Sequence, residues 1–178
     1  SLFLTMGARG SGMKLGVPME PDGETRVAIA PSSMKKLLKA GFEVLIEKNA
    51  GKASNYLDAD YESAGAKMVS RKDVLECDTI ISIRFPGIEG VSKGTRIACV
   101  ADPFRNPQHV QSCIDAGITL LSMDMIPRRL SRAQSMDVNS SQDNLAGYKA
   151  VLLGAAHVPK GIPMMTTSAG TVRPAKVV

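Results

Sequence analysis

Residues 127–141 read P-R-R-L-S-R-A-Q-S-M-D-V-N-S-S, a stretch in which three arginines, a glutamine and an aspartate alternate with hydroxyl side chains. Its apolar residues recur at neither the period of a strand nor that of a helix, so the stretch is predicted to be a loop. The apolar run before it, residues 118–123 (I-T-L-L-S-M), is predicted to be a strand, and residues 141–158 after it a helix. A polar loop at the carboxyl end of a strand is where open α/β sheets bind ligands, although a solvated surface loop has the same composition.

Outward from this stretch, short apolar runs alternate with helix-like segments along the chain. The predicted strands are residues 14–18, 42–47, 67–69, 79–83, 96–100 and 118–123, and the predicted helices cover 34–40, 58–64, 72–77, 106–116 and 141–158. Strands that alternate with helices predict a parallel sheet with right-handed crossovers, and continuous apolar runs are typical of strands buried on both faces. The expected fold class is therefore α/β, a Rossmann-like wound parallel sheet.

Composition excludes several functional classes. The net charge of +5 does not indicate nucleic-acid binding, because no basic stripe is interleaved with aromatic residues that would stack on bases. No run approaches the roughly 20 apolar residues of a membrane span. The two histidines lie far apart in the sequence, which argues against a histidine-based metal site. Cys77, Cys99 and Cys113 each lie singly in or beside an apolar segment, so buried free thiols are expected.

The quoted loop and two earlier segments together resemble the superfamily of alanine dehydrogenase and the NAD-binding part of proton-translocating NAD(P) transhydrogenase. The first segment is G-V-P at 16–18 with E-T-R-V-A-I-A-P at 24–31. The second runs from G-F-E-V at 41–44 through N-A-G at 49–51 to D-Y-E-S-A-G-A at 60–66. The third, R-L-S-R-A-Q-S-M-D at 129–137 followed by N-L-A-G-Y-K-A at 144–150 and A-G-T-V at 169–172, resembles transhydrogenase specifically.

The resemblance implies a domain organisation. Residues 13–140 would be an α/β domain, and 141–178 the linking helix and first strand of a second, truncated NAD-binding domain. Before them, the G-A-R-G-S-G end of residues 1–12 indicates a flexible leader. Residues 164–174 are expected to be a loop, and the strand would begin at Ala175. No G-x-G-x-x-G fingerprint occurs in the chain, because the Gly7, Gly10, Gly12 cluster has a different spacing and follows no strand.

The resemblance also implies a function: the NAD(H)-side component of a Si-specific, proton-translocating transhydrogenase. Such an enzyme transfers hydride from NADH to NADP⁺ held on a partner domain, coupled to proton movement through a membrane-spanning domain. The implied partners are these two domains and a second copy of the chain, with no nucleic acid. The implied location is a soluble domain attached to an inner membrane, on the bacterial cytoplasmic face or in an organelle. The fragment alone is expected to be inactive.

Site residues transfer from the family by matching position. Arg129, Gln134 and Asp137 would be catalytic, in the sense of positioning two nicotinamides for hydride transfer. The cofactor-binding residues would be Arg129, Leu130, Ser131, Gln134, Asp137 and Ser140, and no metal is implied. A carboxamide has one acceptor and one donor group, so an arginine together with an aspartate or serine can fix its rotation. Gln134 is the candidate for touching the second nucleotide. Instead of these functional roles, Arg128 and Arg132 could simply be solvated, and Asp137 could merely precede the helix.

The loop departs from the family pattern in one respect. Between Pro127 and Ser131 it carries one extra residue, so Arg129 is aligned by counting back from Gln134, and Arg128 remains an alternative for the arginine role. Asn139 and Arg173 stand where the family has an apolar residue and a proline.

Alanine dehydrogenase is the main rival. The resemblance places its substrate arginine at Arg26, but its lysine position falls at Arg84, and arginine does not readily release a proton. Its histidine position falls near Asp102, with His109 about two helical turns away in sequence. In this view Arg26 has a structural role, as a partner in an ion pair. A third possibility is a non-catalytic, truncated interaction module, in which the helix with Gly147, Ala150 and Gly154 packs on a partner.

Overall fold

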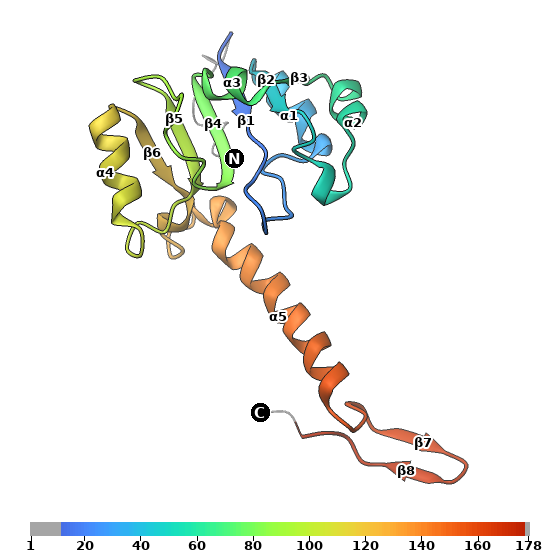
Figure 1. Cartoon of the computed structure of the whole chain (residues 1–178). Coiled ribbons are helices and arrows are strands. Elements are labelled where there is room, and N and C mark those ends of the chain that lie inside the picture. Colours follow the sequence, from blue (N-terminus) through green and yellow to red (C-terminus); the bar gives the residue numbers. More distant parts are fainter. Residues whose placement is uncertain (1–11, 177–178) are drawn as a thin grey trace. The chain divides into compact units, whose positions relative to one another are not determined.

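The computed structural model describes residues 12–176, which divide into two compact units between Asp137 and Val138 (Figure 1). The first unit holds a six-stranded sheet with its helices. The second consists of the long helix α5 and a β-hairpin. The leader expected over residues 1–12 lies outside the described residues except for Gly12.

The sheet of the first unit has the strand order β3-β2-β1-β4-β5-β6, and all five pairs of neighbouring strands are parallel. The strands are β1 (Lys14–Val17), β2 (Glu43–Glu47), β3 (Lys67–Val69), β4 (Thr79–Arg84), β5 (Arg96–Val100) and β6 (Thr119–Ser122). The chain runs outward from β1 to β3, returns to the other side of β1, and continues outward to β6. This is the strand order of dinucleotide-binding folds, with the topological switch point between β1 and β4. The predicted wound parallel sheet is confirmed.

Short helices connect the strands. They are α1 (Met34–Lys39), α2 (Asp58–Ser63), α3 (Arg71–Leu75) and α4 (Pro107–Ala116), with 3-10 turns η1 (Pro31–Ser33), η2 (Lys52–Ser54), η3 (Met123–Met125) and η4 (Gln134–Met136). α1 packs on β2, α2 on β3, α3 on β1 and β2, and α4 on β6. Gly117, in the left-handed conformation at φ 67°, ends α4 and lets the chain turn into β6.

The core lies in two clusters on either side of the switch point. One surrounds β1 and β2 and includes Tyr61, whose buried hydroxyl donates to the carbonyl of Ile29 at 2.9 Å. The other joins β4, β5 and α4 and includes Cys99 and Cys113. All three cysteines are buried and free, as predicted. Burial raises the pKa of the Cys99 thiol to about 12, so this thiol stays protonated.

The second unit differs from the sequence prediction at both ends. α5 spans Val138–His157, so it starts three residues earlier than the predicted Ser141. Asn139 and Ser140 are poor helix formers in a helix interior, but they occupy the first turn, where such residues are tolerated. Residues 164–174, expected to be a loop, contain the antiparallel hairpin β7 (Met165–Thr167) and β8 (Gly170–Val172).

The hairpin forms because Ser168 and Ala169 make a two-residue turn between short β-branched runs. Thr167 Oγ1 accepts from the Ala169 N–H at 3.3 Å and donates to the Gly170 carbonyl at 3.1 Å. The strand expected from Ala175 is absent at Ala175 and Lys176, and its remaining residues lie outside the described part of the chain.

Gly16 in β1 allows α3 to approach the sheet closely. A Cβ atom at this position would lie 2.5 Å from the Val74 carbonyl oxygen and 3.1 Å from the Cys77 sulfur. The obstacle at Val74 is backbone, which cannot move without shifting α3.

We therefore expect Gly16→Ala to lower the free energy of unfolding of the first unit by about 1–3 kcal/mol, because the extra methyl group overpacks the α3–β1 contact. Urea unfolding monitored by circular dichroism measures the change. Gly147→Ala is the matched control, since a Cβ there meets nothing within 4 Å and alanine favours α5. Equal stability of Gly16→Ala and the wild type would contradict the close approach.

Candidate functional site

The carboxyl edge of the sheet carries two groups of polar residues, a cleft at the switch point and the loop that follows β6. The cleft has a volume of about 520 Å³. It is lined by residues after β1 (Pro21, Asp22, Gly23, Glu24), at the end of β4 (Arg84, Phe85), after β5 (Val100, Ala101, Asp102) and around the start of α4 (Asn106, His109). Crevices at the carboxyl ends of strands at a switch point are where α/β sheets bind ligands.

Glu20 fixes one wall of this cleft from within. Its carboxylate is buried and accepts hydrogen bonds from the backbone N–H groups of Ile83 at 2.5 Å and Arg84 at 2.9 Å. Burial raises the pKa of the Glu20 carboxyl above its usual value, while the two backbone hydrogen bonds act in the opposite direction. The carboxylate thereby joins the turn after β1 to the end of β4.

Glu24 pairs with Arg84, which lines the cleft, and with Arg26. Arg26 donates to it from Nε at 2.7 Å and from a terminal nitrogen at 2.5 Å, and Arg84 donates from Nε at 3.3 Å. The hydrogen bonds from the Arg26 side chain lower the pKa of the Glu24 carboxyl to about 2. The ion pair predicted for Arg26 is confirmed, and its partner is the side chain two residues earlier.

His109 lines the cleft, which sequence reasoning missed. Its ring stacks on Phe85 with centroids 4.3 Å apart, and its Nδ1 lies 3.4 Å from the Ala101 carbonyl oxygen. The sequence separates it from Asp102 by two helical turns, but the tight turn at Asp102, at φ 46°, brings α4 back over the end of β5. A positive φ cannot be deduced from an aspartate alone, so the sequence carried no clear signal for this approach.

The loop after β6 is a series of short turns. The Ala133 N–H donates to the Leu130 carbonyl at 2.8 Å, and the Met136 N–H donates to the Ala133 carbonyl at 2.8 Å. Ala133 is buried and anchors the middle of the loop, and η4 occupies residues that were expected to be irregular. At its start, Asp124 accepts from Ser122 Oγ at 2.6 Å and from the Ala101 N–H at 3.2 Å, which ties the loop to the cleft wall.

The structure places most of the predicted site residues on this loop. The side chains of Arg129, Leu130, Ser131 and Gln134 are exposed. Asp137 is different, because its side chain is only 9% exposed and lies 3.9 Å from Nε of Arg128. Ser140 lies in the first turn of α5 and so belongs to the second unit. The loop therefore offers exposed donor groups next to one sheltered carboxylate.

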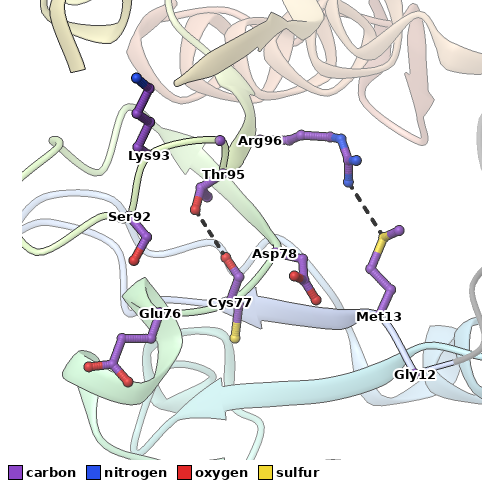
Figure 2. A pocket seen from close by; sticks show the side chains of 10 residues that line it. Gly12, Met13, Glu76, Cys77, Asp78, Ser92, Lys93, Thr95 and Arg96 are labelled. Carbon is purple, nitrogen blue, oxygen red and sulfur yellow. Dashed lines mark hydrogen bonds between the residues drawn. The ribbon is translucent and has the colours of Figure 1, made fainter. Parts of the chain in front are cut away.

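The amino edge of the sheet carries another hollow, of about 450 Å³ (Figure 2). Several of its polar groups have partners within the protein. Thr95 Oγ1 donates to the Cys77 carbonyl at 3.3 Å, Arg96 approaches the Met13 sulfur at 3.6 Å, and the Asp78 carboxylate accepts from the Lys14 N–H at 2.8 Å. We assign it a structural role. Across residues 12–176, no helix has the length and apolar character to span a bilayer, and no cluster of three or more His, Cys, Asp or Glu residues is arranged to hold a metal ion.

Residues 16–146, which include the cleft and the whole loop, match the family described as "Alanine dehydrogenase/PNT, N-terminal domain". The chain belongs to this family. A protein of Rhodospirillum rubrum, named as the first part of NAD(P) transhydrogenase subunit alpha, is 39% identical over 93% of the chain and 46% of its own length. The protein of the same name from Rickettsia prowazekii is 32% identical over 86% of the chain and 42% of its own length.

Solved structures of the family agree with this assignment. A transhydrogenase from Sinorhizobium meliloti matches with a TM-score of 0.85 and 40% identity, covering 91% of the chain and 50% of that structure. An L-alanine dehydrogenase matches less closely, with a TM-score of 0.63 and 27% identity over 68% of the chain and 34% of that structure. The resemblance to the N-terminal region of transhydrogenase alpha subunits is confirmed. The chain spans about half the length of the relatives it matches.

In this family member the ion pair of Glu24 makes stability depend on pH. The folded-state pKa of about 2 lies below the ordinary value of 4.5, so the contribution is complete above pH 4.5 and is lost as the pH falls toward 2. We expect Glu24→Gln to lower the free energy of unfolding at pH 7 by about 1–2 kcal/mol, since water screens the half-exposed Arg26.

The difference between wild type and Glu24→Gln should disappear between pH 4.5 and 2, as measured by urea unfolding at a series of pH values. The raised pKa of Glu20 acts in the opposite direction, but it is common to both proteins. Glu62→Gln, on the exposed side of α2, is the control. A Glu24→Gln deficit that persisted unchanged at pH 2 would show that the ion pair is not its cause.

Proposed function

We propose that this domain is the N-terminal region of the NAD(H)-side component of a proton-translocating NAD(P) transhydrogenase, which transfers hydride from NADH to NADP⁺. The observation that carries the proposal is the loop after β6, which combines exposed arginine and glutamine side chains with a sheltered aspartate at the carboxyl edge of the sheet. The greater likeness to transhydrogenases than to alanine dehydrogenases supports it.

The residue types of the loop fit a nicotinamide. Its carboxamide needs an acceptor for the amide and a donor for the carbonyl, and the Asp137 carboxylate and the Arg129 guanidinium supply these. Ser131 and Ser140 add hydroxyl groups, Leu130 offers an apolar contact for the ring, and Gln134 is the candidate contact for the second nucleotide. When bound, the nicotinamide supplies the hydride chemistry.

The task of this chain would then be positioning. Hydride transfer between two nicotinamides needs no acid or base at the ring, but it needs the reacting carbons held close in a site that excludes water. An arginine and a carboxylate on one short loop can hold a carboxamide at a fixed rotation. This explains why the loop needs neither a histidine nor a metal for the proposed reaction.

The α/β domain of residues 13–140 would be followed by the linking helix and the opening of the second nucleotide domain at 141–178. That second domain would contact the adenosine and pyrophosphate, so the chain alone would have no turnover. The partners would be an NADP(H)-binding domain and a membrane-spanning domain, which would attach the assembly to a bacterial or organellar inner membrane.

Alanine dehydrogenase chemistry remains the second candidate, because His109 does line the cleft. Against it, the lysine position is occupied by Arg84, and both Arg84 and Arg26 are paired with Glu24. A substrate carboxylate would have to compete with Glu24 for these guanidinium groups.

Calorimetric titration of NADH into this chain, joined to the natural continuation of its relatives, tests the proposal. We expect NADH to bind selectively over NADPH. Arg129→Ala should weaken binding at least about tenfold, the effect of losing one charged hydrogen bond. Gln134→Asn should leave NADH binding intact but slow hydride transfer to an NADP analogue on the partner domain. Arg132→Ala, an exposed arginine of the same loop without an assigned role, is the control.

Two results would reject the transhydrogenase proposal: absence of NADH binding by the joined protein, or NAD-dependent turnover of alanine. The second would select the rival enzyme. Equal losses in Arg129→Ala and Arg132→Ala would indicate a general charge effect instead of a specific contact.

We also propose that the second unit joins two copies of the chain. Within α5, which the structure describes in full, no residue is buried, and the exposed apolar side chains include Tyr148, Val151 and Leu152. Met165 and Val172 of the hairpin are exposed as well. An apolar surface of this kind marks an interface, and an isolated two-stranded hairpin is only marginally stable in water.

Sedimentation of the chain should therefore give a dimer, and Tyr148→Lys should shift it toward monomer by placing a charge in the apolar surface. Lys149→Ala, the next residue on the same helix, should leave the dimer unchanged. A wild-type chain that is monomeric at all concentrations would instead assign this surface to another region of the natural protein.

A further inference from the structure

The loop after β6 contains two adjacent arginines, and the structure distinguishes them. Nε of Arg128 lies 3.9 Å from Oδ1 of Asp137, nine positions later. Arg129 is exposed and, within residues 12–176, makes no hydrogen bond or ion pair. One guanidinium therefore pairs across the base of the loop, and the other extends from it without a partner among the described residues.

Asp137 is the residue that makes this pair significant. Its side chain is 9% exposed, against 51% for Arg128, so the carboxylate is sheltered while the guanidinium reaches it from the solvent side. A sheltered carboxylate without a positive partner is unfavourable, because burial disfavours the charged form. Arg128 thus compensates the charge of the carboxylate.

The rest of the loop lies between the two residues of this ion pair. Between the two paired residues the chain is held by short turns, from Pro127–Leu130 through η4 to the Asp137 N–H, which donates to the Gln134 carbonyl at 3.3 Å. Each of these bonds is local, so none joins the first residues of the loop to the last. The Arg128–Asp137 ion pair makes that connection, and Arg129 and Gln134 lie within the closed segment.

We propose that Arg128 is a positioning residue that clamps the loop through Asp137 and leaves Arg129 as the arginine that contacts the nucleotide. The assignment of nucleotide contact rests on the proposed function, whereas the clamp does not. Counting back from Gln134 in the sequence selects Arg129 independently of the ion pair. In this proposal Arg128 acts through Asp137, which lies 3.9 Å from its Nε.

Limited trypsin digestion of the chain tests the clamp without any nucleotide. Cleavage after Arg132, followed by mass spectrometry, reports opening of the loop. Arg128→Ala and Asp137→Asn should each speed this cleavage about three- to fivefold, as expected for losing a partly exposed ion pair, and the double variant should be no faster than either. Arg129→Ala is the matched control and should cleave at the wild-type rate.

Cleavage after Arg71 in α3 serves as the folding control and should be the same in all variants. Arg128→Lys keeps the charge and should restore most of the wild-type protection. Acceleration by Arg129→Ala but not by Arg128→Ala would reverse the assignment, and additive effects of Arg128→Ala and Asp137→Asn would show that the two residues do not act together.

NADH titration of the chain joined to its natural continuation tests the second half of the proposal. Introduced into the wild-type protein, Arg128→Ala should weaken NADH binding about three- to fivefold. Introduced into the Asp137→Asn variant, it should have no further effect. Arg129→Ala should weaken NADH binding in both the wild type and the Asp137→Asn variant. An undiminished effect of Arg128→Ala in Asp137→Asn would make Arg128 a direct contact. If the wild type bound no NADH, the proposed function would be rejected. The trypsin digestion would still test whether Arg128 clamps the loop through Asp137.

Discussion

The carboxyl edge of this sheet depends on the hydrogen bonds that the Ile83 and Arg84 N–H groups donate to the Glu20 carboxylate. β1 pairs with β4 only through Leu15 and Gly16, so the last residues of β4 have no neighbouring strand on that side. Unpaired backbone donors inside a fold are strongly unfavourable, and a carboxylate on the turn after β1 satisfies two of them. The strands can therefore diverge at the switch point without leaving these donors unmet.

The same solution recurs along this edge. Glu47, at the end of β2, accepts from the Met19 N–H at 2.7 Å, and Asp124 accepts from the Ala101 N–H at 3.2 Å. Each carboxylate joins the end of one strand to the turn after its neighbour, where ladder hydrogen bonds have stopped. Acidic side chains thus hold this edge together, and nearby arginine side chains pair with them. Glu24 takes two of these cations, so the cleft presents paired charges to a ligand.

The sheet could be predicted because its strands are continuous apolar runs separated by glycine and helix-like segments, a pattern determined by local sequence. The sequence did not predict the features that depend on distant or marginal interactions. The start of α5 at Val138 was missed because asparagine and serine favour loops in general but are tolerated in a first helical turn. The contact between Glu20 and Ile83 spans 63 residues, and neither residue signals it. The loop after β6 was identified as polar, but its closure by Arg128 and Asp137 is visible only in three dimensions.

The contrast between the cleft and the loop bears on the kind of chemistry this edge can support. In the cleft, a ligand anion would have to displace Glu24 from Arg84, and the low pKa of Glu24 means that this carboxylate stays charged at neutral pH and resists displacement. In the loop, Arg129 is exposed without a protein partner within the described residues, and Asp137 is already compensated by Arg128. A ligand that needs one donor and one acceptor would therefore bind at lower cost on the loop than in the cleft. This asymmetry favours recognition of a carboxamide over recognition of an amino acid, and so favours positioning of a nicotinamide as the role of this domain.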